Sequence, residues 1–241
     1  MDEKVFNRVE KKYLITALEK KALLRAVKKN MNKDKYYKTE IFNIYFDNDN
    51  IELINQSIDW TDFKAKLRAR SYKGYNRVFI EIKTKIRSKD NNLGYKRRVM
   101  ITKEDYKELI DQKSNLVKLA KKSIETKNDI QIAKEAEYLI NHYKLSPKYL
   151  ISYNRTSYRG EANLRVTFDE NLKGRTEKFD FRNRKCDKIY FKDDHNIIME
   201  IKAQGAMPLW LAKELSKLKI YPQRFSKIGK FYQSIRKEQN V

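Results

Sequence analysis

Basic residues recur at every second position in several segments of this chain, and that spacing narrows the possible folds sharply. The stretch 63–72, FKAKLRARSY, carries Lys66, Arg68 and Arg70 at alternate positions. Successive side chains of a strand point to opposite faces, so the three cations would share one face and the apolar residues the other. The pattern predicts a strand with one strongly basic face.

The same alternation appears in other segments, which together predict about eight strands. Besides 63–72, the predicted strands are 6–15, 39–47, 77–86, 94–101, 148–158, 162–172 and 196–205, with a short one at 177–181. Helical periodicity predicts helices over 16–31, 102–112, 129–143, 208–218 and 224–238. Thr16 is the predicted N-cap of the first helix, Thr102 and Asp105 form an acidic relative of the capping box, and Pro147 would end the third.

Hairpins of strands with helices inserted between them are typical of an α+β fold with a predominantly antiparallel sheet. Only three prolines and six glycines occur, and no Ser/Gly/Pro-rich run offers a linker. We therefore expect a single domain over residues 1–241.

The chain carries 55 Lys and Arg residues against 32 Asp and Glu, a formal net charge of +23. Such an excess favours a polyanionic partner, although a merely solvated lysine-rich surface is the alternative. No apolar run approaches the roughly 20 residues that span a bilayer. The charged N-terminus is unlike a secretory signal, and the single Cys186 fits a reducing compartment. We expect a cytoplasmic protein, one that could also lie peripherally at an acidic membrane.

If the apolar faces of the strands meet the helices, the basic faces point either to water or toward one another. In a barrel of about eight strands they would line a lumen, which would need an anionic ligand to offset their repulsion. Arginine forks and lysine point charges both suit phosphoryl groups, and a few carboxylates among them suit Mg²⁺ or Mn²⁺. The candidate inward carboxylates are Glu10, Glu81, Asp169 and Glu200.

Nucleic acid is the competing polyanion. Binders of single strands usually interleave aromatic side chains with basic ones, and in the predicted strands only Tyr45 and Tyr153 do so clearly. No zinc-finger, RNP, Walker or G-x-S-x-G pattern occurs, and His142 and His195 lack metal-ligand spacing. We expect no nucleic-acid partner.

An ordered set of motifs resembles the triphosphate tunnel metalloenzymes, and within them the polyphosphate polymerase domain of the vacuolar transporter chaperone (VTC) complex. The motifs are NRVEKKYLI, KLRARSY, FIEIKTK, YKRRVMI, SYNRTSY, LRVTFD, IMEIKAQG and RFSKIGKFY, and they cover nearly the whole chain. The resemblance implies an eight-stranded antiparallel barrel, a tunnel with helices outside, whose basic wall binds a triphosphate or polyphosphate.

The resemblance also implies roles for individual residues. Those that would act on the phosphates are Lys12, Arg68, Arg70, Lys83, Lys96, Arg155 and Arg165. Further contacts to the substrate would come from Arg8, Arg98, Tyr153, Lys202, Ser226 and Lys227. Glu200 is similar to the metal-binding glutamate of the family, and Glu10 and Glu81 are further candidates for holding Mn²⁺ or Mg²⁺.

The sequence of the first strand distinguishes this chain from some branches of the superfamily. Hydrolytic and cyclase members begin with a Glu-x-Glu-x-Lys strand, whereas this chain has Arg8-Val9-Glu10-Lys11-Lys12. An arginine in place of the first glutamate favours a polymerase that transfers the γ-phosphate of ATP to phosphate or a growing polyphosphate chain. An inorganic or nucleoside triphosphatase and a non-catalytic polyphosphate or nucleic-acid binding module are the alternatives. A membrane partner protein remains compatible with this expectation.

Overall fold

A computed structural model describes residues 8–59, 61–87, 92–123, 126–181 and 187–239 of the chain. Their contacts fall into two compact units, each assembled from three segments. Unit 1 comprises Met1–Glu40, Tyr153–Leu172 and Phe191–Phe225, and unit 2 comprises Ile41–Ser152, Lys173–Tyr190 and Ser226–Val241. The expectation of a single domain stays a prediction.

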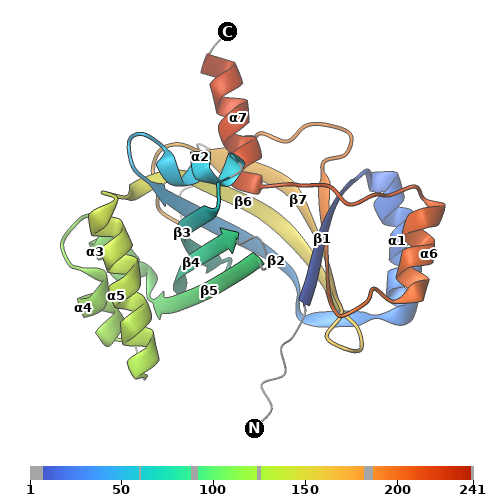
Figure 1. Cartoon of the computed structure of the whole chain (residues 1–241), viewed down its shortest axis with the longest axis horizontal. Coiled ribbons are helices and arrows are strands. Elements are labelled where there is room, and N and C mark those ends of the chain that lie inside the picture. Colours follow the sequence, from blue (N-terminus) through green and yellow to red (C-terminus); the bar gives the residue numbers. More distant parts are fainter. Residues whose placement is uncertain (1–7, 60, 88–91, 124–125, 182–186, 240–241) are drawn as a thin grey trace. The chain divides into compact units, whose positions relative to one another are not determined.

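The described residues form nine strands and seven helices, which confirms the α+β class (Figure 1). Hydrogen-bonded neighbours follow the order β1-β9-β7-β6-β2-β3-β4-β5, with β8 paired to β7. This antiparallel sheet is not closed among the described residues, because the order ends at β1 and β5 without a pairing between them. The strands are β1 (Arg8–Ile15), β2 (Asn32–Asp47), β3 (Phe63–Tyr72), β4 (Val78–Arg87), β5 (Asn92–Ile101), β6 (Ser146–Arg159), β7 (Arg165–Arg175), β8 (Lys188–Ile189) and β9 (Ile197–Gln204).

In unit 1, helices α1 (Ala17–Asn30) and α6 (Leu209–Lys217) lie side by side over one face of β1 and β9 (Figure 1). Thr16 caps α1, because its hydroxyl accepts from the backbone N–H of Glu19 while the Glu19 carboxylate accepts from the Thr16 N–H. The apolar positions of β1, Tyr13 and Ile15, are buried beneath these helices. Their even-numbered neighbours therefore point to the other face of the sheet.

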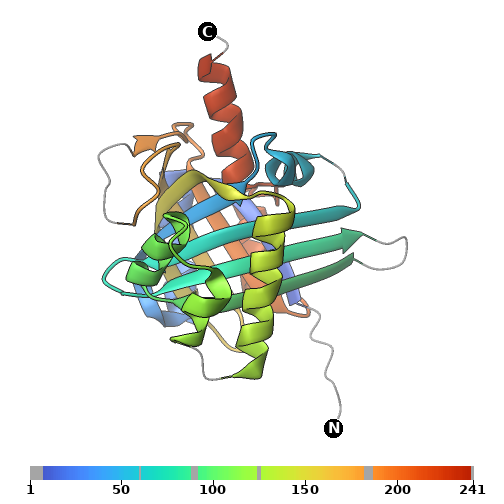
Figure 2. The same cartoon turned by 90° about the vertical axis from the view of Figure 1, so that its left-hand side faces the viewer.

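In unit 2, helices α3 (Lys103–Ile110), α4 (Leu116–Lys121) and α5 (Lys127–His142) cover one face of β3, β4 and β5 (Figure 2). Leu67, Ile80 and Val99 are among the buried residues on that face. Thr102 and Asp105 form the predicted capping box of α3. Helices α2 (Glu52–Ile58) and α7 (Lys227–Gln239) complete the unit.

The structure corrects several sequence predictions. The segment 177–181 is not a strand, because Lys178 adopts a left-handed φ of 52° and the Asp180 carbonyl accepts from Arg175. Helix α5 ends at His142, where a left-handed Lys144 turns the chain, and Pro147 lies within β6. The helix predicted over 224–238 begins at Lys227.

Short elements escaped the sequence patterns. Helices α2 and α4, strand β8 and the first seven residues of β2 were not predicted. None of the helices described is both long and apolar enough to cross a membrane.

Candidate functional site

Unit 2 presents a face of β3, β4 and β5 that is rich in cations. The register of the three strands places these residues in rows. In one row Lys66 is opposite Lys83, which is opposite Lys96. In the next row Arg68 is opposite Glu81, which is opposite Arg98. Directly opposed residues of an antiparallel pair point to the same face, with Cβ atoms about 4.5–5.5 Å apart. We call Lys66, Arg68, Arg70, Lys83, Lys96 and Arg98 the basic wall.

Glu81 is the carboxylate at the centre of the basic wall. One of its oxygens lies 2.7 Å from Arg68 Nε and 3.6 Å from Arg70 Nε, and the other lies 2.7 Å from Lys96 Nζ. Glu81 is 1% exposed. Burial alone would raise its pKa, but attraction to Arg68, Arg70 and Lys96 outweighs burial and lowers the pKa to about 2. Glu81 is therefore the internal counter-ion of the wall, with one oxygen hydrogen-bonded to Arg68 and the other in an ion pair with Lys96.

Strand β2 orients the two arginines of β3. Arg70 Nε donates to the side-chain oxygen of Asn43 at 2.9 Å, and Arg68 donates to the Tyr45 hydroxyl at 3.3 Å. Asn43 and Tyr45 are both buried, and each lies directly opposite the arginine that it contacts. These contacts hold the guanidinium groups in fixed positions, which lowers the entropy lost when they bind a ligand.

The start of α7 adds a hydroxyl to the basic wall. Ser226 Oγ accepts from the backbone N–H of Gly229 and lies 3.3 Å from Lys66 Nζ. Lys227 is the first residue of α7, and its carbonyl accepts from the Tyr190 hydroxyl at 3.5 Å. Unit 2 thus places Ser226, which we expect from the sequence to contact the substrate, beside the lysine row.

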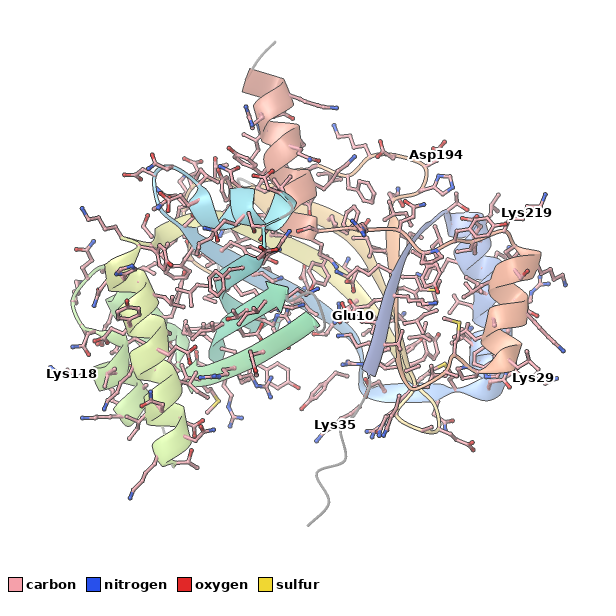
Figure 3. All side chains as sticks on the ribbon, viewed as in Figure 1. Glu10, Lys29, Lys35, Lys118, Asp194 and Lys219 are labelled. Carbon is pink, nitrogen blue, oxygen red and sulfur yellow. The ribbon has the colours of Figure 1, made fainter. Side chains whose placement is uncertain are left out.

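Unit 1 has a polar face of different composition. On β1 and β9, Glu10 pairs with Lys202 and Lys12 pairs with Glu200, and both pairs lie on the face away from α1 and α6, where Figure 3 labels Glu10. Lys202 Nζ lies 2.7 Å from one Glu200 oxygen and 3.4 Å from Glu10. Lys12 Nζ donates to the Phe225 carbonyl at 3.1 Å and lies 3.8 Å from Glu10. Cations and carboxylates alternate here.

Two partly buried arginines of the same face, Arg155 and Arg165, are also matched by acids. Arg155 makes a bidentate ion pair with Asp169, at 2.6 and 2.7 Å. Burial opposes the charge of Arg155, but Asp169 outweighs burial and raises the pKa of the guanidinium. Its guanidinium carbon lies 5.5 Å from the ring centre of Tyr153, itself buried.

Arg165 is held by Ser157 of β6 and by Asp34, which lies outside the predicted strands. Its Nε lies 3.1 Å from Ser157 Oγ and 3.0 Å from Asp34, and Ser157 donates to Asp34 at 2.9 Å. Burial would raise the pKa of Asp34, but the Ser157 hydrogen bond and Arg165 lower it. We call the set the mixed face; its members are Glu10, Lys12, Asp34, Arg155, Arg165, Asp169, Glu200 and Lys202.

The mixed face holds the residues that fit a divalent metal. In the described part of the chain no three His, Cys, Asp or Glu side chains form a metal site by themselves. Mg²⁺ typically takes one or two carboxylates and completes its shell with waters and substrate phosphates. Glu200 and Glu10, both within 3.4 Å of the Lys202 ammonium, supply carboxylates of that kind. These two carboxylates suit a divalent ion whose other ligands are waters and the oxygens of a bound phosphate.

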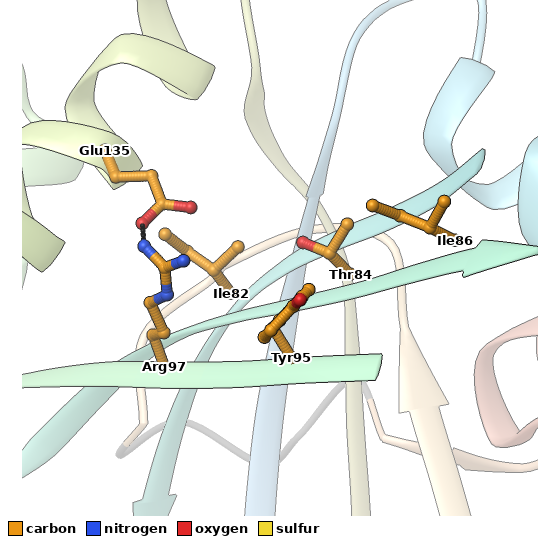
Figure 4. Close-up of a pocket in the computed structure, with 6 residues that line it drawn as sticks. All are labelled: Ile82, Thr84, Ile86, Tyr95, Arg97 and Glu135. Atoms are coloured by element: carbon orange, nitrogen blue, oxygen red, sulfur yellow. Dashed lines mark hydrogen bonds and ion pairs between the residues drawn. The ribbon is translucent and has the colours of Figure 1, made fainter. Parts of the chain in front are cut away.

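The reverse face of β4 and β5 carries a pocket of about 210 Å³, lined mainly by Ile82, Ile86 and Tyr95 and edged by an Arg97–Glu135 ion pair at 2.6 Å (Figure 4). None of the residues predicted to bind phosphate lines this pocket. The mainly apolar lining of this pocket is unsuited to binding a phosphate group.

The sequence patterns identified most residues of the basic wall and of the mixed face, but not the residues that hold them in position. Asn43 and Tyr45 shared one face of a predicted strand, and that alternation could have identified them. Asp34 lies in a part of β2 that no pattern marked, so no signal was available. Arg8 lies in β1 with its backbone opposite Gln204, and its side chain is outside the described residues.

Comparisons with known proteins agree with the fold. The family model described as the VTC domain matches residues 7–236. A Hippeastrum protein described as a proposed adenylyl cyclase with a dominant triphosphatase activity is 16% identical, with 94% of this chain and 95% of that one covered and a TM-score of 0.54. A search of curated proteins by sequence found no match.

Two weaker structural matches have TM-scores below 0.5. A proposed adenylate cyclase from Vibrio parahaemolyticus is 11% identical, covers 96% of this chain and 98% of its own, and has a TM-score of 0.46. The PH1819 protein of Pyrococcus horikoshii is 15% identical, with 96% and 99% covered and a TM-score of 0.43.

Proposed function

The chain belongs to the VTC domain family, and from that premise we propose that it transfers the γ-phosphoryl group of ATP to phosphate or to a growing polyphosphate chain. The substrates would be ATP and phosphate or polyphosphate, and the cofactor Mn²⁺ or Mg²⁺. The product could pass to a membrane partner protein.

The observation that carries this proposal is the composition of the basic wall. Six cations share it with one carboxylate, and Lys66, Lys83 and Lys96 stand directly opposite one another on three strands. Like charges in directly opposed positions destabilise a sheet. A row of lysines is therefore costly without a ligand, and a chain of phosphoryl groups supplies the compensating charge at regular intervals.

The proposed reaction needs no protein nucleophile. An oxygen of the acceptor phosphate forms a bond to the γ-phosphorus while the bond from that phosphorus to the β–γ bridging oxygen breaks, and ADP leaves. Phosphoryl transfer depends on positioning and on stabilising charge. Arg68 and Arg70, fixed by Tyr45 and Asn43, would bind phosphoryl oxygens in pairs.

The mixed face would contribute the metal. Glu200 would hold the ion, with Glu10 beside it, and Lys202 would have to yield its contact with Glu200. When bound, a divalent ion neutralises charge that develops on the phosphoryl oxygens. Arg155 and Arg165 would bind phosphate oxygens while Asp169 and Asp34 keep them in place.

A triphosphatase is the second candidate, favoured by the activity described for the Hippeastrum protein. In that reaction water replaces phosphate as the acceptor, and every residue above keeps its role. The difference lies at the start of β1, where Arg8-x-Glu10-x-Lys12 offers one carboxylate instead of two. One carboxylate fewer leaves less scope for activating water on a second ion, so we favour the polymerase.

Incubating the purified chain with ATP and Mn²⁺, followed by analysis of phosphate products, tests the proposal. Long-chain polyphosphate formed in step with ADP is the expected result. Free phosphate as the sole phosphate product would assign the triphosphatase instead, and an absence of turnover with tight polyphosphate binding would leave a binding module.

A further inference from the structure

Thr167 occupies the middle of the mixed face and was not among the residues predicted to act. On β7 it lies between Arg165 and Asp169, and in the β7–β9 register it is directly opposite Glu200. Lys12 is opposite Glu200 on the other side, so Lys12, Glu200 and Thr167 form one row across β1, β9 and β7. Residues opposed in this way point to the same face, so the Thr167 side chain stands beside that of Glu200.

The Thr167 hydroxyl is buried and unsatisfied. Thr167 is 4% exposed, and its Oγ1 has no hydrogen-bond partner among the described residues. The groups on either side along β7 do have partners, since Arg165 contacts Ser157 and Asp169 binds Arg155. Leaving a buried hydroxyl without a partner is unfavourable, because no hydrogen bond replaces the ones it would make with water. A partner is therefore expected from outside the protein.

The position of the hydroxyl identifies what that partner is. We propose that Thr167 is a positioning residue, whose hydroxyl binds an oxygen coordinated to the divalent ion at Glu200, either of a water or of a phosphoryl group. Mg²⁺ and similar ions keep several oxygen ligands beyond those of the protein. Opposed Cβ atoms lie about 4.5–5.5 Å apart, which brings such an oxygen within reach of a threonine side chain. The inference rests on the metal assignment in the proposed function.

Substitution by valine separates this role from a structural one. Valine has the shape of threonine without the hydroxyl, so Thr167→Val removes an unsatisfied group and should leave the ligand-free protein as stable as before or slightly more so. Thr167→Ser keeps the hydroxyl. Thr84→Val is the matched control, because Thr84 lies on the reverse face of β4.

The experiment measures Mn²⁺ affinity in the presence of tripolyphosphate, by thermal shift and calorimetry, for the natural protein, the three threonine variants and Glu200→Gln. We expect Thr167→Val to lose roughly 10- to 100-fold in Mn²⁺ affinity, the range found when a partner of a metal's ligands is removed. Thr167→Ser and Thr84→Val should bind Mn²⁺ nearly as the natural protein does. Tripolyphosphate binding without Mn²⁺ identifies the source of the oxygen: a loss there assigns a phosphoryl oxygen, and no loss assigns a coordinated water.

Unchanged Mn²⁺ affinity in Thr167→Val, alongside a clear loss in Glu200→Gln, would overturn the inference and leave the proposed function standing. A Thr167→Val protein that melts well below the natural one without ligand would also overturn it, because the hydroxyl would then serve the fold. Failure to make polyphosphate would contradict the polymerase proposal alone, since Mn²⁺ affinity is measured without turnover.

Discussion

Glu81 and Glu200 are both buried glutamates on the polar faces of strands, yet their surroundings differ. Glu81 in unit 2 is held by Arg68, Arg70 and Lys96, in a face with six cations. Glu200 in unit 1 contacts Lys202, which it shares with Glu10, in a face with four cations and four carboxylates. The first carboxylate is surrounded by positive charge, and the second has another acid close by.

The difference points to two purposes for a carboxylate on a face that we propose to bind phosphate. Where it is outnumbered by cations it lowers their mutual repulsion, and a metal ion would have to displace them. Where carboxylates and cations are balanced, a cation from solution can join without creating a large excess of charge. We therefore propose that unit 1 holds the metal and that unit 2 binds phosphate without one.

The largest expected effect is that of Glu200→Gln. We expect turnover to fall by roughly 10²- to 10³-fold or more, the scale on which removal of one electrostatic contact to a transition state acts. Binding of polyphosphate without metal should change little, because the basic wall is intact. Steady-state rates with ATP and Mn²⁺ and a polyphosphate binding assay measure both. Unchanged turnover would refute the metal role of Glu200.

Arg70→Ala should act on phosphate binding while sparing the fold. Arg70 contacts Asn43 and lies 3.6 Å from Glu81, which keeps Arg68 and Lys96 when Arg70 is removed. We expect turnover to drop by about 10²-fold with a small change in melting temperature, and Arg68→Ala to lose activity likewise. Arg97→Ala, on the reverse face of β5, is the control and should keep full activity. Equal losses in Arg70→Ala and Arg97→Ala would mean that the basic wall has no special role.

Glu81→Gln should destabilise the protein instead of abolishing catalysis. Losing the buried acid leaves three cations without their counter-charge, which costs about 3 kcal/mol in unfolding free energy on the scale of broken buried ion pairs. Phosphate should bind at least as tightly as before, because Arg68 and Lys96 are released toward the ligand. Urea unfolding measures the free energy of unfolding, and a tripolyphosphate titration measures the affinity for phosphate. Weaker tripolyphosphate binding at undiminished stability would contradict the counter-ion role.

Lowering the pH should weaken the same ion pairs of Glu81, with a smaller effect on the unfolding free energy than Glu81→Gln has. The folded-state pKa of Glu81 is depressed, from an ordinary value of 4.5 to about 2. Its contribution to stability is therefore complete above about pH 4.5 and is lost as the pH falls toward 2. Between these values the natural protein should lose unfolding free energy that Glu81→Gln does not lose. Equal losses of unfolding free energy in the two proteins across that pH range would contradict the counter-ion role of Glu81.

Alternation in the sequence was enough to predict most strands and the faces of their cations. A period of two assigns Arg68, Glu81 and Arg98 to a common face, but only the register places them in one row. The pattern treated Glu81 and Glu200 alike, because the partners that distinguish them come from other strands. Asp34 and Ser157 escaped notice for a related reason: their contact spans 123 residues of sequence.

Comparing Mn²⁺ binding in Glu81→Gln and Glu200→Gln, each with tripolyphosphate present, tests the division of roles most directly. We predict that Glu200→Gln loses the Mn²⁺-dependent heat and that Glu81→Gln, measured under conditions where it is folded, retains it. The opposite outcome, with Mn²⁺ binding lost in Glu81→Gln and kept in Glu200→Gln, would contradict the assignment of the metal to unit 1.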